Sequence, residues 1–194
     1  MTTPPSPTRR LRILHLSPAP IYDVEDGKGM PSIFLGLKGA VDRGHQVIFA
    51  VAGRENRDYD YHGIRVYEWR IPVPVAPIEH RWLHRLSQKL WGAAYYVIAA
   101  VKGLRLAARF QPDIVYGQFL YAAPVAWLIG KVHGIPNITR MYGTFLFPYV
   151  GSWWGRLWKA EEVLAFVTPC TYLICTNDGT RGRDVAQALG VPAE

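Results

Sequence analysis

Cysteines and long apolar segments are scarce in this sequence of 194 residues. Its two cysteines, Cys170 and Cys175, would point to opposite faces of one predicted strand, which argues against a disulfide between them. The longest uncharged apolar run, residues 91–101, is too short to cross a bilayer. Residues 1–10 lack the apolar core of a secretory signal. We therefore expect a cytoplasmic protein with a flexible lead over residues 1–10.

Acidic residues are missing between His80 and Pro112, a segment that carries six lysines and arginines in a chain of net charge +7. A basic surface attracts nucleic acid, anionic lipid or phosphorylated ligands. The sequence has no helix-turn-helix, zinc-finger or RNA-binding signature. We therefore expect no nucleic-acid partner.

Histidines and cysteines show no spacing typical of a metal or nucleophile site. His80 and His84 lie one helical turn apart but lack an acidic companion ligand. No G-x-S-x-G motif is present, and neither cysteine has an evident basic partner. We expect no metal and no cofactor.

Apolar runs of strand length alternate with stretches of helical period, a pattern typical of an α/β fold whose parallel sheet is covered by helices on both faces. The predicted strands are 11–16, 46–51, 64–69, 113–118, 137–142 and 171–176, and the predicted helices are 31–44, 80–109, 121–133, 153–167 and 178–189. Residues 11–194 are expected to form one domain, and ligands of such sheets bind at the carboxyl ends of the strands.

The stretch DGKGMPSIFL, residues 26–35, lies at one of these strand ends. It fails the dinucleotide fingerprint G-x-G-x-x-G because the third position is Ser32, and no triphosphate-binding loop is present. Gly27, Lys28 and Gly29 nevertheless precede a predicted helix start, where free N–H groups and the helix dipole favour phosphate. The alternative is a plain surface loop that uses glycine for its backbone freedom.

Several stretches, taken in order, resemble glycosyltransferase family 4 (group 1) enzymes of the GT-B fold. They are RILHLSPAP, SIFLGLKGAVDRGHQVIFAV, QPDIVYGQ, GKVHGIPNITRMYGT and LICTNDGTRGRDVAQALGVPAE. The resemblance covers residues 11–194. It implies a Rossmann-like N-terminal, acceptor-side domain of a retaining hexosyltransferase that moves a sugar from a nucleotide-sugar donor to a glycan or lipid-linked acceptor.

The resemblance also implies that a C-terminal, donor-binding domain lies outside these 194 residues, and that this piece alone is inactive. The nucleotide sugar would be a substrate rather than a cofactor. Gly27, Lys28 and Gly29, together with Gly143 and Thr144, would face the donor diphosphate and the cleft. Tyr116, Gln118 and Arg140 would lie on the acceptor side of that cleft.

Tyr142 stands where the family has the histidine of a Thr-x-His-Gly turn, because this chain reads Arg140-Met141-Tyr142-Gly143. The resemblance makes Tyr142 the candidate catalytic residue, as a contact of the transferred sugar. A phenol with an ordinary pKa of about 10 is a poor general base at neutral pH, so we expect a hydrogen-bonding role.

The predicted helix over 80–109, with a potential break at Gly92, carries two stripes. A core stripe is expected at Leu83, Leu86, Leu90, Ala94, Val97, Val101, Leu104 and Ala108. A second stripe, formed by Trp91, Tyr95, Lys102, Arg105 and Arg109, grades from aromatic to cationic. It would suit an anionic membrane surface or a phosphorylated or lipid-linked acceptor. The alternative is aromatic packing at a domain edge with solvated arginines.

Two other functions stay open on the sequence. One is a non-catalytic subunit that docks on the inner face of a membrane and presents the acceptor to a separate donor-binding chain. The other is an NAD(P)-dependent Rossmann enzyme.

Overall fold

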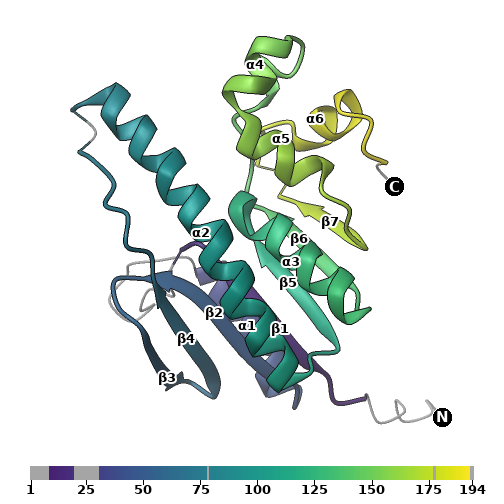
Figure 1. Cartoon of the computed structure of the whole chain (residues 1–194). Helices are drawn as coiled ribbons and strands as arrows, with labels where there is room; N and C mark the ends of the chain where they lie inside the picture. The colour runs from purple at the N-terminus through teal and green to yellow at the C-terminus, as the bar shows by residue number, and fades with distance from the viewer. Residues whose placement is uncertain (1–8, 20–30, 78, 177, 193–194) are drawn as a thin grey trace, which may run out of the picture.

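The computed structural model describes residues 9–19, 31–77, 79–176 and 178–192 of the chain. They form a seven-stranded sheet in the order β3-β4-β2-β1-β5-β6-β7 (Figure 1). The strands are β1 (Arg12–Ser17), β2 (Gln46–Gly53), β3 (Arg57–Tyr61), β4 (Ile64–Arg70), β5 (Ile114–Gln118), β6 (Asn137–Met141) and β7 (Tyr172–Cys175). All neighbouring pairs are parallel except β3 and β4.

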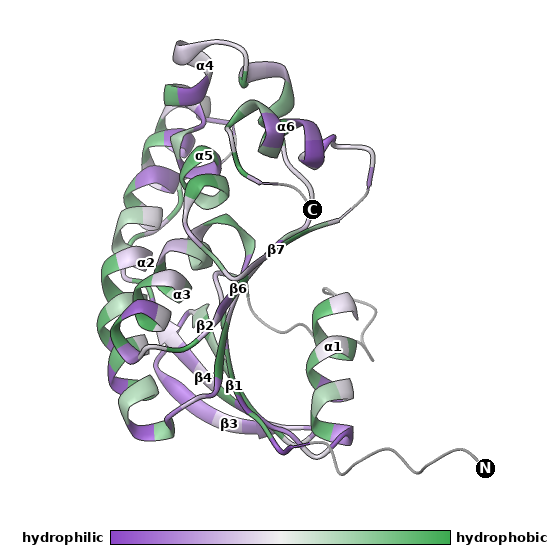
Figure 2. Ribbon diagram, turned by 90° about the vertical axis from the view of Figure 1, so that its right-hand side faces the viewer, coloured by the Kyte–Doolittle hydropathy of each residue, from purple (hydrophilic) through white to green (hydrophobic). Residues whose placement is uncertain are grey.

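Helices cover both faces of this sheet. They are α1 (Pro31–Asp42), α2 (Arg81–Phe110), α3 (Phe119–His133), α4 (Trp153–Trp158), α5 (Ala160–Val167) and α6 (Gly182–Ala188), with a short 3-10 turn at Phe147–Tyr149. Helix α1 lies on one face, and α2, α3 and α5 lie on the opposite face (Figure 2). The predicted α/β, Rossmann-like fold is confirmed, including all six predicted strands.

Strand β3 was missed because only its tyrosines turn inward, which leaves no run of apolar residues. It pairs antiparallel with β4 at the edge of the sheet, and Arg65 of β4 forms ion pairs with Asp58 and Asp60. The predicted helix 153–167 is two helices, which meet at Lys159.

The predicted core stripe of α2 is wrong at most of its positions, although Ala94 and Leu104 are half-buried and pack against the core. Leu83, Leu86, Leu90, Val97 and Val101 are all exposed, and the helix continues through Gly92 without a break. The buried face consists instead of Gly92, Tyr95, Ala99, Gly103 and Ala107.

Small residues select this face because they let α2 approach its neighbours closely. A Cβ added at Gly92 would lie 2.5 Å from Cε1 of Tyr121 on α3, and one at Gly103 would lie 2.8 Å from Cδ1 of Ile129. Tyr95 fills the remaining space between helix and sheet and is 1% exposed.

The predicted aromatic-to-cationic stripe is therefore not a continuous surface. Tyr95 belongs to the core, so its prediction as a surface residue is wrong. The half-buried Trp91 ring stacks on Tyr95, with ring centroids 5.6 Å apart. Lys102 donates to Oδ1 of Asn56 at 2.6 Å, and partial burial lowers its pKa. Of the five residues of the predicted stripe, only Arg105 and Arg109 are exposed.

Replacing Tyr95 by alanine is expected to destabilise the protein by about 3–5 kcal/mol, the typical cost of emptying a buried aromatic site. Leu90→Ala, on the exposed face of the same helix, should change the free energy of unfolding by less than about 0.5 kcal/mol. Urea denaturation of both variants measures this difference. Equal costs, or a larger cost for Leu90→Ala, would contradict the observed orientation of α2.

Candidate functional site

Four of the predicted site residues meet at the carboxyl ends of β5 and β6. Tyr116 and Gln118 lie on β5, Arg140 lies on β6 opposite Gln118, and Tyr142 follows β6 directly. Because side chains alternate along a strand, Tyr116, Gln118 and Arg140 share the sheet face opposite α3. The sequence prediction had placed these residues at one strand edge, and the structure brings them together as one cluster.

A chain of hydrogen bonds links Tyr142 to the interior. The Tyr142 hydroxyl donates to Oε1 of Gln118 at 2.7 Å, and Nε2 of Gln118 lies 3.2 Å from Nδ1 of His15. An amide nitrogen can only donate, so Nδ1 of His15 accepts and its proton resides on Nε2. Gln118 is 3% exposed, and this chain therefore fixes the orientation of the Tyr142 hydroxyl.

His15 was missed as a site residue because it shows no metal spacing and stands inside a predicted strand. The structure stacks its ring on Tyr116, with centroids 4.7 Å apart. Register supplies a signal that could have found it, because His15 of β1 is the direct neighbour of Tyr116 on β5.

Burial sets the protonation states of His15 and Tyr142, the two ends of this series of hydrogen bonds. It lowers the pKa of His15 to about 3 and raises the pKa of Tyr142 to about 12, although the charge of Arg140 acts against the shift at Tyr142. At neutral pH, His15 is a neutral imidazole and Tyr142 is a protonated phenol. Tyr142 can thus hold a hydrogen bond to a ligand but cannot remove a proton from it.

Arg140 is the cation of the cluster. Its guanidinium lies 4.7 Å from the centre of the Tyr142 ring, and its Nε is buried without a hydrogen-bond partner among the described residues. Within residues 9–19, 31–77, 79–176 and 178–192, no carboxylate forms an ion pair with it. Burial raises the pKa of Tyr116, and the neighbouring Arg140 opposes that rise. Arg140 is therefore positioned to receive an anionic or strongly polar group.

The loop after Tyr142 is held by the buried carboxylate of Glu162 on α5. Its Oε2 accepts from the Thr144 hydroxyl at 2.8 Å and from the Phe145 N–H at 2.9 Å. Its Oε1 pairs with Lys159 at 2.9 Å. Glu162 lies within the predicted helix 153–167, and nothing in the local sequence marks it as the anchor of a loop.

Thr144 is turned into this network, so the expected direct contact of its side chain with a ligand is corrected to a positioning role. Its backbone N–H donates to the Thr180 hydroxyl at 3.0 Å, which fastens the loop from the other side. Gly143 adopts φ +95°, and a Cβ there would lie 2.4 Å from Oδ2 of Asp178. Only glycine fits this turn without displacing its neighbours.

Phe119, the first residue of α3, directly follows β5 and has a left-handed backbone, φ +64°. A residue with a side chain is strained there by about 1–3 kcal/mol. Its ring packs against Tyr142, with centroids 4.7 Å apart. The strained turn thus supports the same side chain that Gln118 orients.

The glycine loop with Gly27, Lys28 and Gly29 lies outside the residues that the structure describes. The helix that follows it does reach the cluster, because Ser32 in the first turn of α1 forms a hydrogen bond that acts on the pKa of Tyr142. The predicted contribution of the three loop residues stays a prediction.

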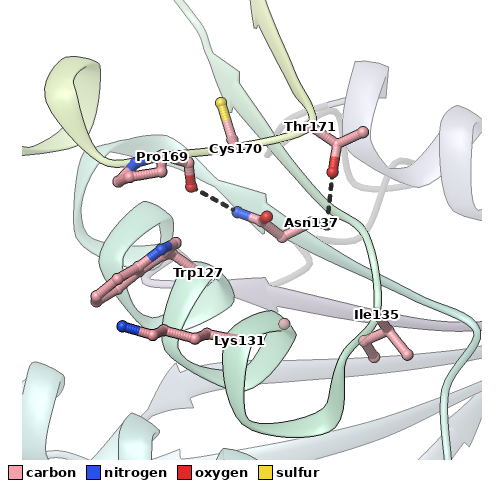
Figure 3. Close-up of a pocket in the computed structure, with 8 residues that line it drawn as sticks. Trp127, Lys131, Ile135, Asn137, Pro169, Cys170 and Thr171 are labelled. Atoms are coloured by element: carbon pink, nitrogen blue, oxygen red, sulfur yellow. Dashed lines mark hydrogen bonds between the residues drawn. The ribbon is translucent and has the colours of Figure 1, made fainter.

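A separate pocket of about 280 Å³ lies at the other end of the strands, near the starts of β6 and β7 (Figure 3). It is lined by Trp127 and Lys131 of α3, by Asn137 at the start of β6, and by the segment before β7. The Asn137 amide already donates to the Pro169 carbonyl at 3.1 Å, and Lys131 stacks over Trp127. This pocket is thus distant from the carboxyl ends of the strands, where the predicted site residues lie. Among the described residues no group of three or more His, Cys, Asp or Glu is arranged to hold a metal ion.

The fold is that of one half of a GT-B glycosyltransferase. UGT89C1 of Arabidopsis thaliana, crystallised with UDP-L-rhamnose, superposes with a TM-score of 0.60 at 12% identity, over 94% of this chain and 49% of that one. UGT73P12 of Glycyrrhiza uralensis, crystallised with glycyrrhetinic acid 3-O-monoglucuronide, gives a TM-score of 0.55 at 10% identity, over 94% and 47%. The chain thus spans about half the length of these structures.

The sequence model of Glycosyltransferase Family 4 matches residues 37–194. The chain belongs to this family. No curated protein matches it in sequence.

Replacing Glu162 by glutamine should destabilise the protein by about 1–3 kcal/mol, because Lys159 loses its buried partner and the Thr144 hydroxyl and Phe145 N–H lose a charged acceptor. Amide hydrogen exchange at Phe145 should also accelerate. Glu161→Gln, the same change one residue earlier, is the matched control. Unaltered exchange at Phe145 in Glu162→Gln would show that the carboxylate does not hold the loop.

The buried neutral His15 predicts a pH dependence of stability. Its folded pKa is about 3 against an ordinary value of 6.5, so the unfolded chain binds one more proton between these values. The free energy of unfolding should therefore fall as pH drops below 6.5, by at most about 1.4 kcal/mol per pH unit. Urea unfolding between about pH 7 and 5, above most carboxylate titration, measures the slope. His15→Gln should flatten it and His80→Gln, at an exposed histidine, should not; an unchanged slope in His15→Gln would contradict the assignment.

Proposed function

We propose that the chain is the N-terminal, acceptor-side domain of a retaining glycosyltransferase. It would move a hexosyl group from a nucleotide-sugar donor to a glycan or lipid-linked acceptor. The observation that carries this proposal is the family match over residues 37–194, supported by the cluster at the carboxyl ends of β5 and β6. Family membership also argues against the nicotinamide-dependent alternative.

The donor class is supported by the complex of UGT89C1 with UDP-L-rhamnose. In the proposed reaction the bond between the sugar and the diphosphate breaks, and an acceptor hydroxyl takes the place of the leaving group. The negative charge on the departing diphosphate must be stabilised, and cations and N–H groups serve this purpose. We assign that task to Gly27, Lys28 and Gly29 from this domain, and to the donor-binding domain of the whole enzyme.

Tyr142 would contact the transferred sugar. Its proton is committed to Gln118 and Ser32 also contacts its oxygen, so one lone pair is left to accept a hydrogen bond from a sugar hydroxyl. Arg140 and Tyr116 would bind polar groups of the acceptor, while Gly143 shapes the loop beside them. None of these residues is assigned the role of a base, which suits a mechanism driven by leaving-group stabilisation.

The substitution Tyr142→Phe in the whole enzyme should lower kcat/KM about 10- to 100-fold, because one oriented hydrogen bond to the sugar is lost. Gln118→Leu should produce a similar loss by releasing the Tyr142 hydroxyl. Tyr59→Phe, at the distant edge strand β3, is the matched control. Release of nucleoside diphosphate from a panel of nucleotide sugars measures the rates.

The 194-residue chain by itself should give no transfer in the same assay. Turnover by the isolated chain would contradict its role as one half of the catalytic site, and full activity of Tyr142→Phe would remove Tyr142 from that site.

A further inference from the structure

The amino-terminal half of α2 projects beyond the sheet (Figure 1). It carries large apolar side chains that are exposed to solvent. Trp82 is 69% exposed and Leu90 is 54% exposed, with Leu83 and Leu86 exposed between them. Val97 and Val101 continue the row along the helix. These side chains form a row of exposed apolar residues along α2, and large exposed apolar patches mark protein or membrane interaction sites.

Helix α4 adds a second group of exposed side chains beside it. Trp154 is 66% exposed and its ring stacks on that of Trp153, while Leu157 and Trp158 are also exposed. The guanidinium of Arg85 on α2 lies 4.6 Å from the centre of the Trp158 ring and so joins the two helices. We call this combined surface the α2–α4 face; it consists of Trp82, Leu83, Leu86, Leu90, Trp153, Trp154, Leu157 and Trp158.

Positive charge is interleaved with the α2–α4 face. Arg85 and Lys89 are exposed between its apolar residues, and α2 contains no acidic residue over its 30 positions. The acidic residues nearest in the chain are Glu79, before α2, and Glu161 and Glu162 on α5. Glu162 is buried and paired with Lys159. The two charged side chains interleaved with the face itself, Arg85 and Lys89, are thus both positive.

The combination of exposed apolar residues and positive charge indicates what could cover the α2–α4 face. A second copy of the face would bring Arg85 and Lys89 against their own equivalents, which is repulsive. An anionic bilayer surface complements every component, because tryptophan favours the headgroup region, leucine enters the acyl boundary, and lysine and arginine attract anionic lipids. No helix in the described part of the chain is long and apolar enough to span a bilayer. A helix that lies on the surface has no need of that length.

We propose that the α2–α4 face docks the domain on the surface of an anionic membrane. The residues that do so differ from those predicted, since the docking side of α2 carries Leu83, Leu86 and Leu90, and Tyr95 lies in the core. The proposal does not depend on the transferase assignment, because it rests on this surface alone.

Co-sedimentation with vesicles tests the proposal without any sugar substrate. The 194-residue chain should bind vesicles of phosphatidylcholine containing phosphatidylglycerol at low salt, and bind pure phosphatidylcholine much less. Arg85→Gln/Lys89→Gln should weaken partitioning about 10- to 30-fold, as expected for two cations near a charged surface. Trp153→Ser/Trp154→Ser should weaken it by at least about 10-fold.

Matched controls separate the face from general charge and apolarity. Arg43→Gln/Arg70→Gln removes the same charge elsewhere, and Val132→Ser removes an exposed apolar residue of α3. Both should bind vesicles like the unmodified chain. If either control weakens binding as much as the face variants, the proposal is wrong.

A second measurement needs no substitution. Brominated phosphatidylcholine in the anionic vesicles should quench the tryptophan fluorescence of the bound chain, since four tryptophans belong to the face. Failure to bind anionic vesicles at low salt overturns the proposal. So does self-association in sedimentation velocity that Trp153→Ser/Trp154→Ser abolishes while vesicles are not bound, because a second copy would then be the occupant. Vesicle binding by the 194-residue chain, together with no sugar transfer by the whole enzyme, would leave the docking surface intact and reject only the transferase assignment.

Discussion

Parallel pairing of β1, β5 and β6 is the constraint on which the candidate site depends. The register sets His15 beside Tyr116 and Gln118 beside Arg140, so that one sheet face collects all four side chains. A slip of one residue would turn Gln118 and Arg140 toward α3, because side chains alternate with a period of two. The hydrogen bonds of the backbone ladder thus decide which side chains lie together at this end of the sheet.

The strand-end residues could be predicted because their position follows from local pattern. Each of Tyr116, Gln118 and Arg140 falls near the end of an apolar run of strand length, and parallel strands bring such ends to one edge. The alternation of strands and helices was therefore enough to predict at which end of the sheet these residues lie. Their hydrogen-bond partners required more, since His15 and Gln118 are separated by 103 residues.

Helix α2 shows why the period of apolar residues predicted the wrong buried face of a helix. Its leucines and valines outrank glycine and alanine on any hydropathy scale, so the row from Leu83 to Val101 has the stronger apolar pattern. The sheet and α3 instead accept the row with Gly92, Ala99 and Gly103, because close approach of backbones buries more surface than large side chains held at a distance. Hydropathy reports which residues avoid water and does not report which row can fit against its neighbours.

Anchoring of the loop by Glu162 illustrates a second limit. The carboxylate binds groups 17 and 18 residues earlier in the chain, through atoms of the backbone as well as side chains. No spacing rule connects these positions, since the contact arises only after α5 has packed against α3. A buried ion pair with Lys159 is costly to desolvate, and the loop hydrogen bonds help to offset that cost.

At Phe119, the stability of the domain and the fixed position of Tyr142 favour different residues. A glycine there would relieve the left-handed backbone, yet it would remove the ring that packs on Tyr142. Selection for a more stable domain and selection for a fixed Tyr142 hydroxyl would favour different residues. Across natural variants of this domain, the residue at this turn should therefore record which demand has been the stronger.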